Sequence, residues 1–416
     1  MKFNNAPFLF SSCHSHPANE QARPSKHWTR RGISKYLIFI RLLFDTYRSP
    51  HLGLVIFILF CTRPGLSQTE FVLPMDAETW EVQGEEHRWT DYKGQRSLYL
   101  KEGRATVPDV QLQDGIIDFD IAFPQARMFV GIQFRQQDAY NYEEFYIRPH
   151  QSGKPDAMQY SPVYNGATGW QLYNGQGHWA NYDYSFDNWT HVRIILAGQQ
   201  MELYIDDMEK PVLYNQALKR PQKAGYLAVR SSMGGAYYAN FRYQKIDNPK
   251  ITSPNIAAPT AEAGSIQQWQ VSSTFPDSLL GDGHQIPASL KKSLRWKGFA
   301  TETSGLLNIA RNDSVSELRN TVFAKVVLKS EKEQIQRFDF GYSDQVIVFL
   351  NGKAIYGGQY IFRSRDYRFL GSIGYFDTLF LPLQKGRNEL WIAVTENFGG
   401  WGFQGRLPQL KDLQIE

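Results

Sequence analysis

Acidic, basic, amide and aromatic side chains alternate along the segment from Val130 to His150. Successive side chains of a β-strand point to opposite faces, so alternate residues share a face. If Arg135 lies opposite Tyr142 in an antiparallel pair, Gln133 lies opposite Glu144 and both polar sets reach one face. That face then carries seven groups able to hydrogen-bond, ion-pair or stack: Gln133, Arg135, Tyr142, Glu144, Tyr146, Arg148 and His150.

These residue types suit a ligand rich in hydroxyl groups. Planar charged groups such as those of Glu144 and Arg148 form paired hydrogen bonds with adjacent hydroxyls, and tyrosine rings stack on the C–H faces of sugars. Gly131, opposite Tyr146, leaves space above the sheet. The alternative is an ordinary solvated face with cross-strand ion pairs, which are common. Glu143 falls in the same alternating set as the residues expected to face the core. A charged residue there is expected only at the start of a strand or at a bulge.

A second aromatic-rich segment covers residues 160–184 and reads YSPVYNGATGWQLYNGQGHWANYDY. Its rings stand among Gly and Asn, a composition that is too polar for pure core and is typical of binding loops. Trp170 and Trp179 are therefore candidate sugar-stacking residues. The alternative is that both rings pack beneath a loop.

Glu144 is also the candidate for a catalytic acid or base, with His150 or His178 as an assistant. Most glycosidases use two facing carboxyl groups about 5–10 Å apart. Glu143 and Glu144 are adjacent and would point to opposite faces, so they do not form such a pair. The nine His residues show no metal-ligand spacing, and no G-x-S-x-G motif supports serine hydrolysis. We expect no metal centre and no cofactor, with a structural calcium ion left open.

Runs in which apolar and polar residues alternate, separated by turn residues, predict the β-strands that carry these side chains. The clearest run is IIDFDIAF at residues 116–123, and residues 192–196 and 201–205 continue the pattern. No long amphipathic helix and no internal repeat stand out. Short alternating strands with frequent turns favour an antiparallel β-sandwich.

A change of composition divides the chain. Residues 248–265 contain three Pro, many small residues and no large aromatic, which is typical of a linker. Strand patterns return afterwards, and Asn351–Gly352 predicts a tight hairpin turn. The predicted fold class is all-β, with two β-sandwich (jelly-roll) domains in tandem at residues 68–247 and 266–416.

Residues 1–67 read as a leader with a secretory signal. The ten-residue apolar run LGLVIFILFC at residues 52–61 follows basic residues and precedes a turn, and cleavage is expected near Ser67–Gln68. A spanning helix needs about 20 apolar residues, so no membrane span is expected after signal removal. The alternative is an uncleaved N-terminal anchor. The predicted location is secreted or periplasmic.

Removal of this leader changes the charge and the cysteine content. Of 45 basic and 41 acidic residues, the leader holds nine and two, which leaves 36 and 39 and a net charge of −3. Nothing in that balance favours nucleic acid. Both cysteines, Cys13 and Cys61, lie in the leader, so the mature chain would have neither a disulfide nor a thiol nucleophile.

Residues 71–246 resemble the concanavalin A-like lectin/glucanase (LamG-like) sandwiches, and among them the 3-keto-disaccharide hydrolase-like domains. The stretches that carry the resemblance are DGIIDFDIAF, FVGIQFRQQDAYNYEEFYIRPH, FDNWTHVRIILAGQQMELYIDD and AGYLAVRSSMGGAYYANFRY. The resemblance implies a Glu on the concave face, and parity favours Glu144. Laminarinase-type glucanases in addition carry an E-x-D-x-x-E strand with two working carboxylates. That motif is missing here, which weighs against an enzyme.

Residues 266–416 resemble the galactose-binding-like jelly rolls attached to glycoside hydrolases. The segments FGYSD, VFLNGK and LPLQKGRNEL carry this resemblance, and all three are scaffold motifs.

The leading hypothesis is a secreted or periplasmic carbohydrate-binding protein of polysaccharide utilisation. One alternative is an enzyme that cleaves glycosidic bonds, of the 3-keto-disaccharide hydrolase-like type. The other is a surface adhesion or structural protein. The sequence leaves the sugar, the linkage and the oligomeric state open.

Overall fold

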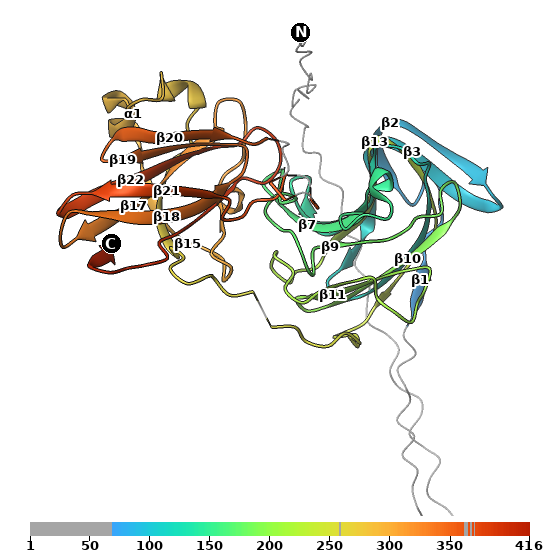
Figure 1. Ribbon diagram of the computed structural model, residues 1–416. Coiled ribbons are helices and arrows are strands. Elements are labelled where there is room, and N and C mark those ends of the chain that lie inside the picture. The colour runs from blue at the N-terminus through green and yellow to red at the C-terminus, as the bar shows by residue number, and fades with distance from the viewer. Residues whose placement is uncertain (1–68, 258, 362–364, 367, 370) are drawn as a thin grey trace, which may run out of the picture. The chain divides into compact units, whose positions relative to one another are not determined.

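The computed structural model describes residues 69–257, 259–361, 365–366, 368–369 and 371–416 (Figure 1). The predicted leader lies outside these residues. In the part of the chain that is described, strands dominate and one α-helix is found, α1 (Ala288–Ser293). No helix there has the length and apolar character needed to cross a bilayer. The all-β prediction is confirmed.

One group of strands, which we call the N-terminal sheet, occupies residues 70–245. Its members are β1 (Glu70–Val72), β2 (Glu81–Tyr92), β3 (Gln95–Leu112), β4 (Gly115–Ala122), β5 (Phe129–Asp138), β6 (Asn141–Ile147), β7 (Met158–Tyr164), β8 (Ala167–Thr168), β9 (Trp179–Ala180), β10 (Thr190–Ala197), β11 (Gln200–Ile205), β12 (Leu213–Asn215) and β13 (Gly225–Lys245). The main path through the sheet is β12-β11-β10-β4-β13-β5-β6-β7-β8.

The long strand β13 explains how this sheet folds over its own core. Residues 226–232 of β13 pair with β5, and residues 237–245 pair with β4, with register shifts along the way. One continuous strand therefore serves two parts of the sheet, and bulges of this kind bend a strand. The alternate apolar residues of both parts meet in one buried cluster, as Phe119 of β4, Ile132 of β5 and Phe145 of β6 illustrate.

A second group, the C-terminal sheets, occupies residues 268–415. Its strands are β14 (Gln268–Ser272), β15 (Trp296–Ala300), β16 (Leu307–Asn308), β17 (Thr321–Ser330), β18 (Gln334–Tyr342), β19 (Gln345–Leu350), β20 (Lys353–Gln359), β21 (Asp377–Leu383), β22 (Gly386–Thr395), β23 (Gly402–Arg406) and β24 (Leu413–Ile415). A seven-stranded and a four-stranded sheet share a core that includes Trp269, Phe338 and Val348. Both groups thus have the character of β-sandwiches.

The predicted hairpin turn at Asn351–Gly352 is confirmed. Asn351 and Gly352 have φ of +52° and +84° and join β19 to β20, which pair antiparallel. Between the two strand groups, the described residues of 248–264 belong to no strand. By their contacts, the described residues from 69 onward fall into one compact unit, so the division into two tandem domains with a linker stays a prediction.

A charged cluster crosses β10 and β4 on the surface of the N-terminal sheet. His191 Nδ1 lies 2.6 Å from Asp120 Oδ1, and its Nε2 lies 3.2 Å from Asp118 Oδ1. Arg193 Nε donates a further bond of 2.7 Å to Asp118. The hydrogen bonds to Asp118 and Asp120 raise the pKa of His191 to about 9. The imidazolium is thus part of the link between these strands.

This cluster predicts a pH-dependent contribution to stability. Because the folded pKa of His191 lies above the unfolded value of about 6.5, its contribution is complete below pH about 6.5 and is lost as the pH rises through about 9. Urea unfolding of the wild type and His191→Gln at pH 6, 7.5 and 9.5 measures it. The difference in unfolding free energy should shrink toward alkaline pH. A difference that stays constant, or grows, contradicts the assignment.

Candidate functional site

The register of β5 and β6 agrees with the predicted polar face over most of its length. Gly131 lies opposite Tyr146, and Gln133 lies opposite Glu144. Phe145 belongs to the buried cluster of the N-terminal sheet, so these four alternate residues point away from that cluster. We call this side of β5, β6 and β7 the outward face.

Arg135 does not belong to the outward face, and its predicted pairing with Tyr142 is wrong. The register shifts after Phe134, and Arg135 has φ of +49°. Its Nε donates to the carbonyl of Gln113 (2.8 Å), and its Nη2 lies 2.9 Å from Asp114 Oδ1. The side chain is 1% exposed. The physical reason is a β-bulge, which turns the side chain of the inserted residue out of the alternating pattern.

Glu143 points into the core, as its parity indicates. Its Oε2 accepts a hydrogen bond of 2.5 Å from the hydroxyl of Tyr160, and its Oε1 accepts one of 3.1 Å from the amide of Arg220. Burial raises the pKa of the Glu143 carboxyl. This group is a satisfied component of the core and has no access to a ligand on the outward face.

Glu144 points to the outward face and is held from two sides. Its Oε2 accepts a bond of 2.9 Å from Arg230 Nη1 of β13, and its Oε1 accepts one of 2.9 Å from the hydroxyl of Thr168 of β8. The ion pair is mostly buried, since the side chains of Glu144 and Arg230 are 3% and 20% exposed. Pairing and hydrogen bonding are what make a buried carboxylate tolerable.

Arg148 and Tyr146 form a second buried polar group on the same face. Arg148 Nη2 donates to the hydroxyl of Tyr146 (3.2 Å) and to Gln159 Oε1, and its Nη1 donates to the carbonyl of Asp156 (3.0 Å). The guanidinium carbon lies 5.0 Å from the centroid of Tyr146 and 5.9 Å from that of Trp179. Both terminal nitrogens of Arg148 therefore already donate hydrogen bonds within the protein, and the side chain is fixed in the face.

Trp170 and Trp179 are buried, which corresponds to the packing alternative. The centroid of Trp179 lies 4.0 Å from that of Phe369, which comes from the chain after β20. A Cβ at Gly371 would approach the Trp170 ring to 2.6 Å, so these two groups are in close contact. Both indoles pack against segments near the C-terminal sheets and do not form an open platform.

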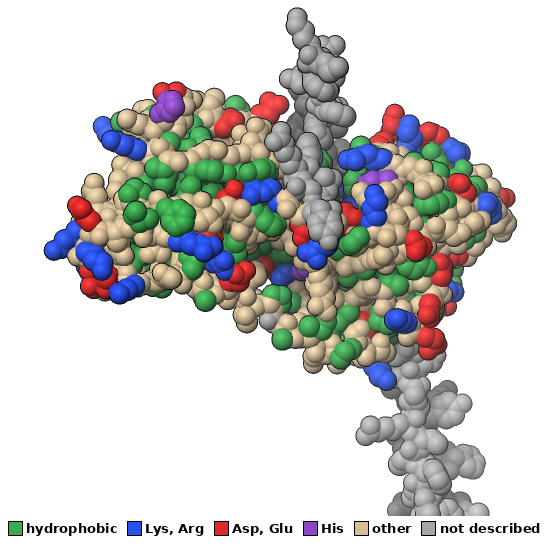
Figure 2. Space-filling view, in the orientation of Figure 1, with side chains coloured by type: hydrophobic (Ala, Val, Ile, Leu, Met, Phe, Trp, Pro, Cys, Tyr) green, Lys and Arg blue, Asp and Glu red, His purple; other side chains and the backbone are tan. Residues whose placement is uncertain are grey.

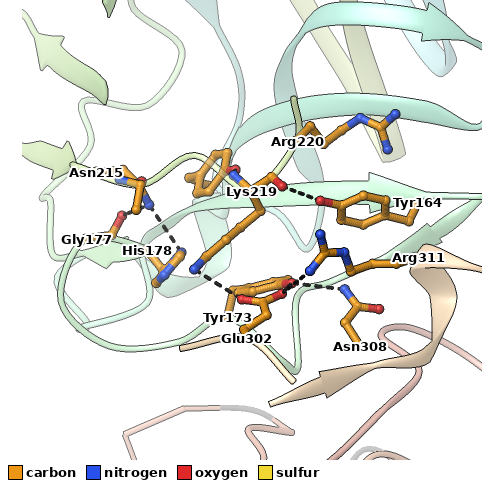
Figure 3. Close-up of polar contacts among 12 residues, drawn as sticks. Tyr164, Tyr173, Gly177, His178, Asn215, Lys219, Arg220, Glu302, Asn308 and Arg311 are labelled. Carbon is orange, nitrogen blue, oxygen red and sulfur yellow. Dashed lines mark hydrogen bonds and ion pairs between the residues drawn. The ribbon is translucent and has the colours of Figure 1, made fainter. Parts of the chain in front are cut away.

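A charged cluster centred on the buried carboxylate of Glu302 anchors the same aromatic segment (Figure 3). We call it the Glu302 cluster: Tyr173, Lys219, Glu302, Asn308 and Arg311. The hydroxyl of Tyr173 donates to Glu302 and accepts from Asn308 (3.0 Å). Lys219 and Arg311 lie 3.2 Å and 3.8 Å from the carboxylate oxygens of Glu302. The cluster ties the 160–184 segment to residues that follow β15.

In the part of the chain that the structure describes, neither of the two histidines considered as catalytic assistants has a hydrogen bond or ion pair with Glu144. His150 is in the 3₁₀ turn η1 (Pro149–Gln151), with its ring edge-on to Phe129 at 5.5 Å. Burial, and then the nearby Arg127, lowers the pKa of His150 to about 4. His178 packs on Tyr160, and burial lowers its pKa to about 3. Both rings are neutral at pH 7, and neither contacts the carboxylate.

The accessible part of the outward face is small and polar. Arg230 is 20% exposed at its side chain, and Tyr142 and Thr168 are half-buried. Gln133 Oε1 is buried without a hydrogen-bond partner in the described residues. A buried acceptor without a partner is uncommon and is satisfied when a ligand or water donates to it. The arrangement offers a rigid guanidinium, a phenol edge and an amide.

Three residues of this face were missed from the sequence: Gln159, Thr168 and Arg230. Arg230 lies in an alternating strand, YLAVRSS, and its parity is readable there. What was not readable is that β13 pairs with β5, because the two strands are about a hundred residues apart. Thr168 belongs to a two-residue strand that no periodicity signals.

Among the described residues, no group of three or more His, Cys, Asp or Glu side chains is placed to hold a metal ion. The structural calcium ion considered above stays a prediction.

The fold and the outward face define an all-β protein of the β-sandwich class. No family model matches the sequence, and no curated protein matches it. Solved structures that it resembles include the carbohydrate binding module CBM66 from Bacillus subtilis (15% identity, TM-score 0.31, 39% of this chain and 94% of that chain) and a Bacillus licheniformis beta-glucanase (10%, 0.32, 43% and 99%). A laminarinase from Flavobacterium sp. UMI-01 is a third (10%, 0.31, 42% and 95%).

The Glu302 cluster predicts a loss of stability in Tyr173→Phe. This change removes the hydroxyl that donates to Glu302 and accepts from Asn308, and a bond to a buried charged group is worth about 1.5–3 kcal/mol. Urea unfolding measures the change. Tyr140→Phe is the matched control, because Tyr140 is 64% exposed and its hydroxyl has no bond among the described residues. Equal stability of both variants would contradict a structural role for the cluster.

Proposed function

We propose that this chain binds carbohydrate on the outward face without cleaving it. The observation that supports this most directly is the ion pair of Glu144 with the partly exposed Arg230, beside the unpartnered amide oxygen of Gln133. A ligand hydroxyl can accept a hydrogen bond from the exposed part of Arg230. Polar groups placed in this way, with an aromatic edge beside them, are typical of sugar-binding sites.

In this proposal Glu144 acts through Arg230. The carboxylate fixes the guanidinium in one orientation, so little side-chain entropy is lost when a ligand binds. Tyr142, half-buried next to this pair, supplies the ring edge. Glu144 is therefore a positioning residue, and Arg230 and Tyr142 are the residues expected to touch the sugar.

Binding without cleavage is favoured over glycosidic hydrolysis. Both oxygens of Glu144 are engaged by Arg230 and Thr168. The adjacent acid Glu143 points into the core and is fully buried, so it does not face Glu144 across a ligand. Hydrolysis by the common mechanisms requires a second carboxyl group that faces the first across the sugar.

The adjacent acids Glu143 and Glu144 provide a matched test. Glu144→Gln removes the charge that orients Arg230 and should weaken glycan binding about tenfold or more, since a charge-assisted hydrogen bond is worth about 1.5–3 kcal/mol. Glu143→Gln makes the same chemical change on the opposite face of the strand and should leave affinity unchanged. A glycan array followed by calorimetry on the best glycan measures both.

Three outcomes contradict the proposal: no glycan binds, both variants lose affinity equally, or Glu144→Gln binds as the wild type does. Circular dichroism and urea unfolding of both variants separate a local loss of binding from a loss of fold. A readout of released reducing ends from the same glycans addresses the enzyme alternative directly.

We further propose that residues 1–67 are a secretory leader and that the protein acts outside the cytoplasm, secreted or periplasmic, in polysaccharide utilisation. The support is the basic, apolar and small-residue order of the leader. Expression of the full chain in a bacterial host, with mass mapping of the N-terminus in each cell fraction, should find a chain that begins at Gln68 outside the cytoplasm. An intact start in the membrane fraction would favour the uncleaved anchor.

Exposed apolar side chains favour a surface adhesion or structural role as the second candidate. Ile335 and Phe380 are 72% and 68% exposed, and they lie on β18 and β21, which pair with each other. Hydrophobic side chains gather over part of the C-terminal sheets (Figure 2). Large exposed apolar patches mark interaction surfaces. Absence of any glycan binding would favour this candidate.

A further inference from the structure

A polar groove opens at the outer edge of the seven-stranded C-terminal sheet and shares no lining residue with the outward face described above. It has a volume of about 660 Å³, within the range of about 300–1,000 Å³ that is common for ligand sites. β15 is the last strand of that sheet, and it lines the groove together with β14 and residues 312–319. The lining side chains that matter here are Arg295, Trp296, Lys297, Phe299, Asp313 and Arg319.

The aromatic part of the groove is held rigidly. Trp296 meets Trp391 edge-on, with centroids 4.8 Å apart and an interplanar angle of 82°. Lys325 Nζ lies 4.0 Å from the centroid of the Trp296 ring. Phe299 packs against the core of the C-terminal sheets. Trp296 and Phe299 stand three residues apart in β15, so the two rings point to opposite faces of that strand. Phe299 shares its face of the strand with Lys297, so Phe299 is the ring placed to meet the C–H face of a sugar beside a cation.

The charges of the groove are mainly positive. Arg295, Lys297 and Arg319 are all exposed, and none has an ion-pair partner within 4 Å among the residues that the structure describes. Asp313 is the single acid of the lining; burial raises its pKa, and the nearby Arg319 and Lys297 act in the opposite direction. Three cations therefore face one acid, which leaves an excess of positive charge in the groove.

Hydrogen-bonding groups complete the lining. Thr274 and Asn312 are solvent-accessible, and their side chains make no hydrogen bond within the described residues. Ser273 lies beside them, and its hydroxyl accepts a bond of 3.3 Å from the amide of Arg295. Free hydroxyl and amide groups next to rings and cations distinguish this groove from a simple anion site, where cations alone are enough.

We propose that this groove binds a segment of an acidic polysaccharide. The carboxylate or sulfate groups of the polymer pair with Arg295, Lys297 and Arg319, the C–H face of a sugar ring lies on Phe299, and its hydroxyls bond to the neutral polar groups. Arginine is suited to both anions, because its fork matches their oxygens. The groove is independent of the outward face, so this site stands or falls separately from the proposed function.

Nucleic acid, another polyanion, is the less favoured occupant. After the predicted leader the chain carries 36 bases and 39 acids, so there is no broad basic surface to follow a phosphate backbone. The excess of cations is confined to one groove of limited volume. This geometry fits a few sugar units better than a long phosphodiester chain.

The experiment is calorimetry on the full chain with four probes of matched length: a galacturonate oligomer, a sulfated galactan oligomer, a neutral galactan oligomer and single-stranded DNA. One or both acidic oligosaccharides should bind, and the affinity should fall as salt rises from 50 to 300 mM. Arg295→Ala with Arg319→Ala should weaken that binding at least tenfold. Both residues are exposed, so the variant is expected to fold.

Lys385→Ala with Lys411→Ala is the control, because it removes the same charge from exposed positions outside the groove. It should change the affinity less than twofold. The acidic oligosaccharide that binds shows whether the groove prefers carboxylate or sulfate. The proposal is overturned if neither acidic oligosaccharide binds, if the control loses as much affinity as the arginine variant, or if DNA binds as tightly as the best sugar. Neutral galactan binding that both double variants retain would belong to the outward face.

Discussion

The ion pair between Glu144 and Arg230 is the constraint on which the outward face depends. A carboxylate that is 3% exposed is stable only when its charge is paired and its oxygens accept hydrogen bonds. Arg230 reaches it from β13 and Thr168 from β8, so strands far apart in sequence must keep one register. Loss of one partner would leave a buried charge uncompensated, at a cost of about 3–5 kcal/mol. The same restraint makes the guanidinium a rigid donor.

The sequence predicts the parts of this arrangement that alternation controls. Parity alone places Gln133 and Glu144 on one face and separates Glu143 from Glu144 across the sheet. The direct opposition of Gln133 to Glu144 is predicted from a pairing of Arg135 with Tyr142 that the structure does not contain. Alternation cannot predict the bulge that carries Arg135 to Asp114, because the inserted residue obeys no period. The all-β fold class can also be predicted from alternation, because each strand by itself has a two-residue repeat of apolar and polar side chains. The partners of a strand are not readable in this way.

Aromatic composition is a weaker guide than alternation. Trp170 and Trp179 stand among Gly and Asn, which describes a loop but not what covers it. In the structure the cover comes from Phe369 and Gly371, about two hundred positions along the chain. Tyr173 is held in the same way by Glu302. Contacts between distant segments thus decide whether a tryptophan in a loop is exposed or packed. Such contacts cannot be predicted from the local pattern of a single sequence.

The outward face and the edge groove present charge in opposite ways. At the outward face, Glu144 balances Arg230, so the local charge is near zero and recognition rests on the direction of hydrogen bonds. At the groove, Arg295, Lys297 and Arg319 outnumber the one acid, Asp313, so attraction is Coulombic and is screened within a Debye length of about 8–10 Å at 0.1–0.15 M salt. The two sites therefore differ in salt dependence for a structural reason. A balanced, buried pair suits neutral hydroxyls, whereas an excess of exposed cations suits the anionic groups of a polymer.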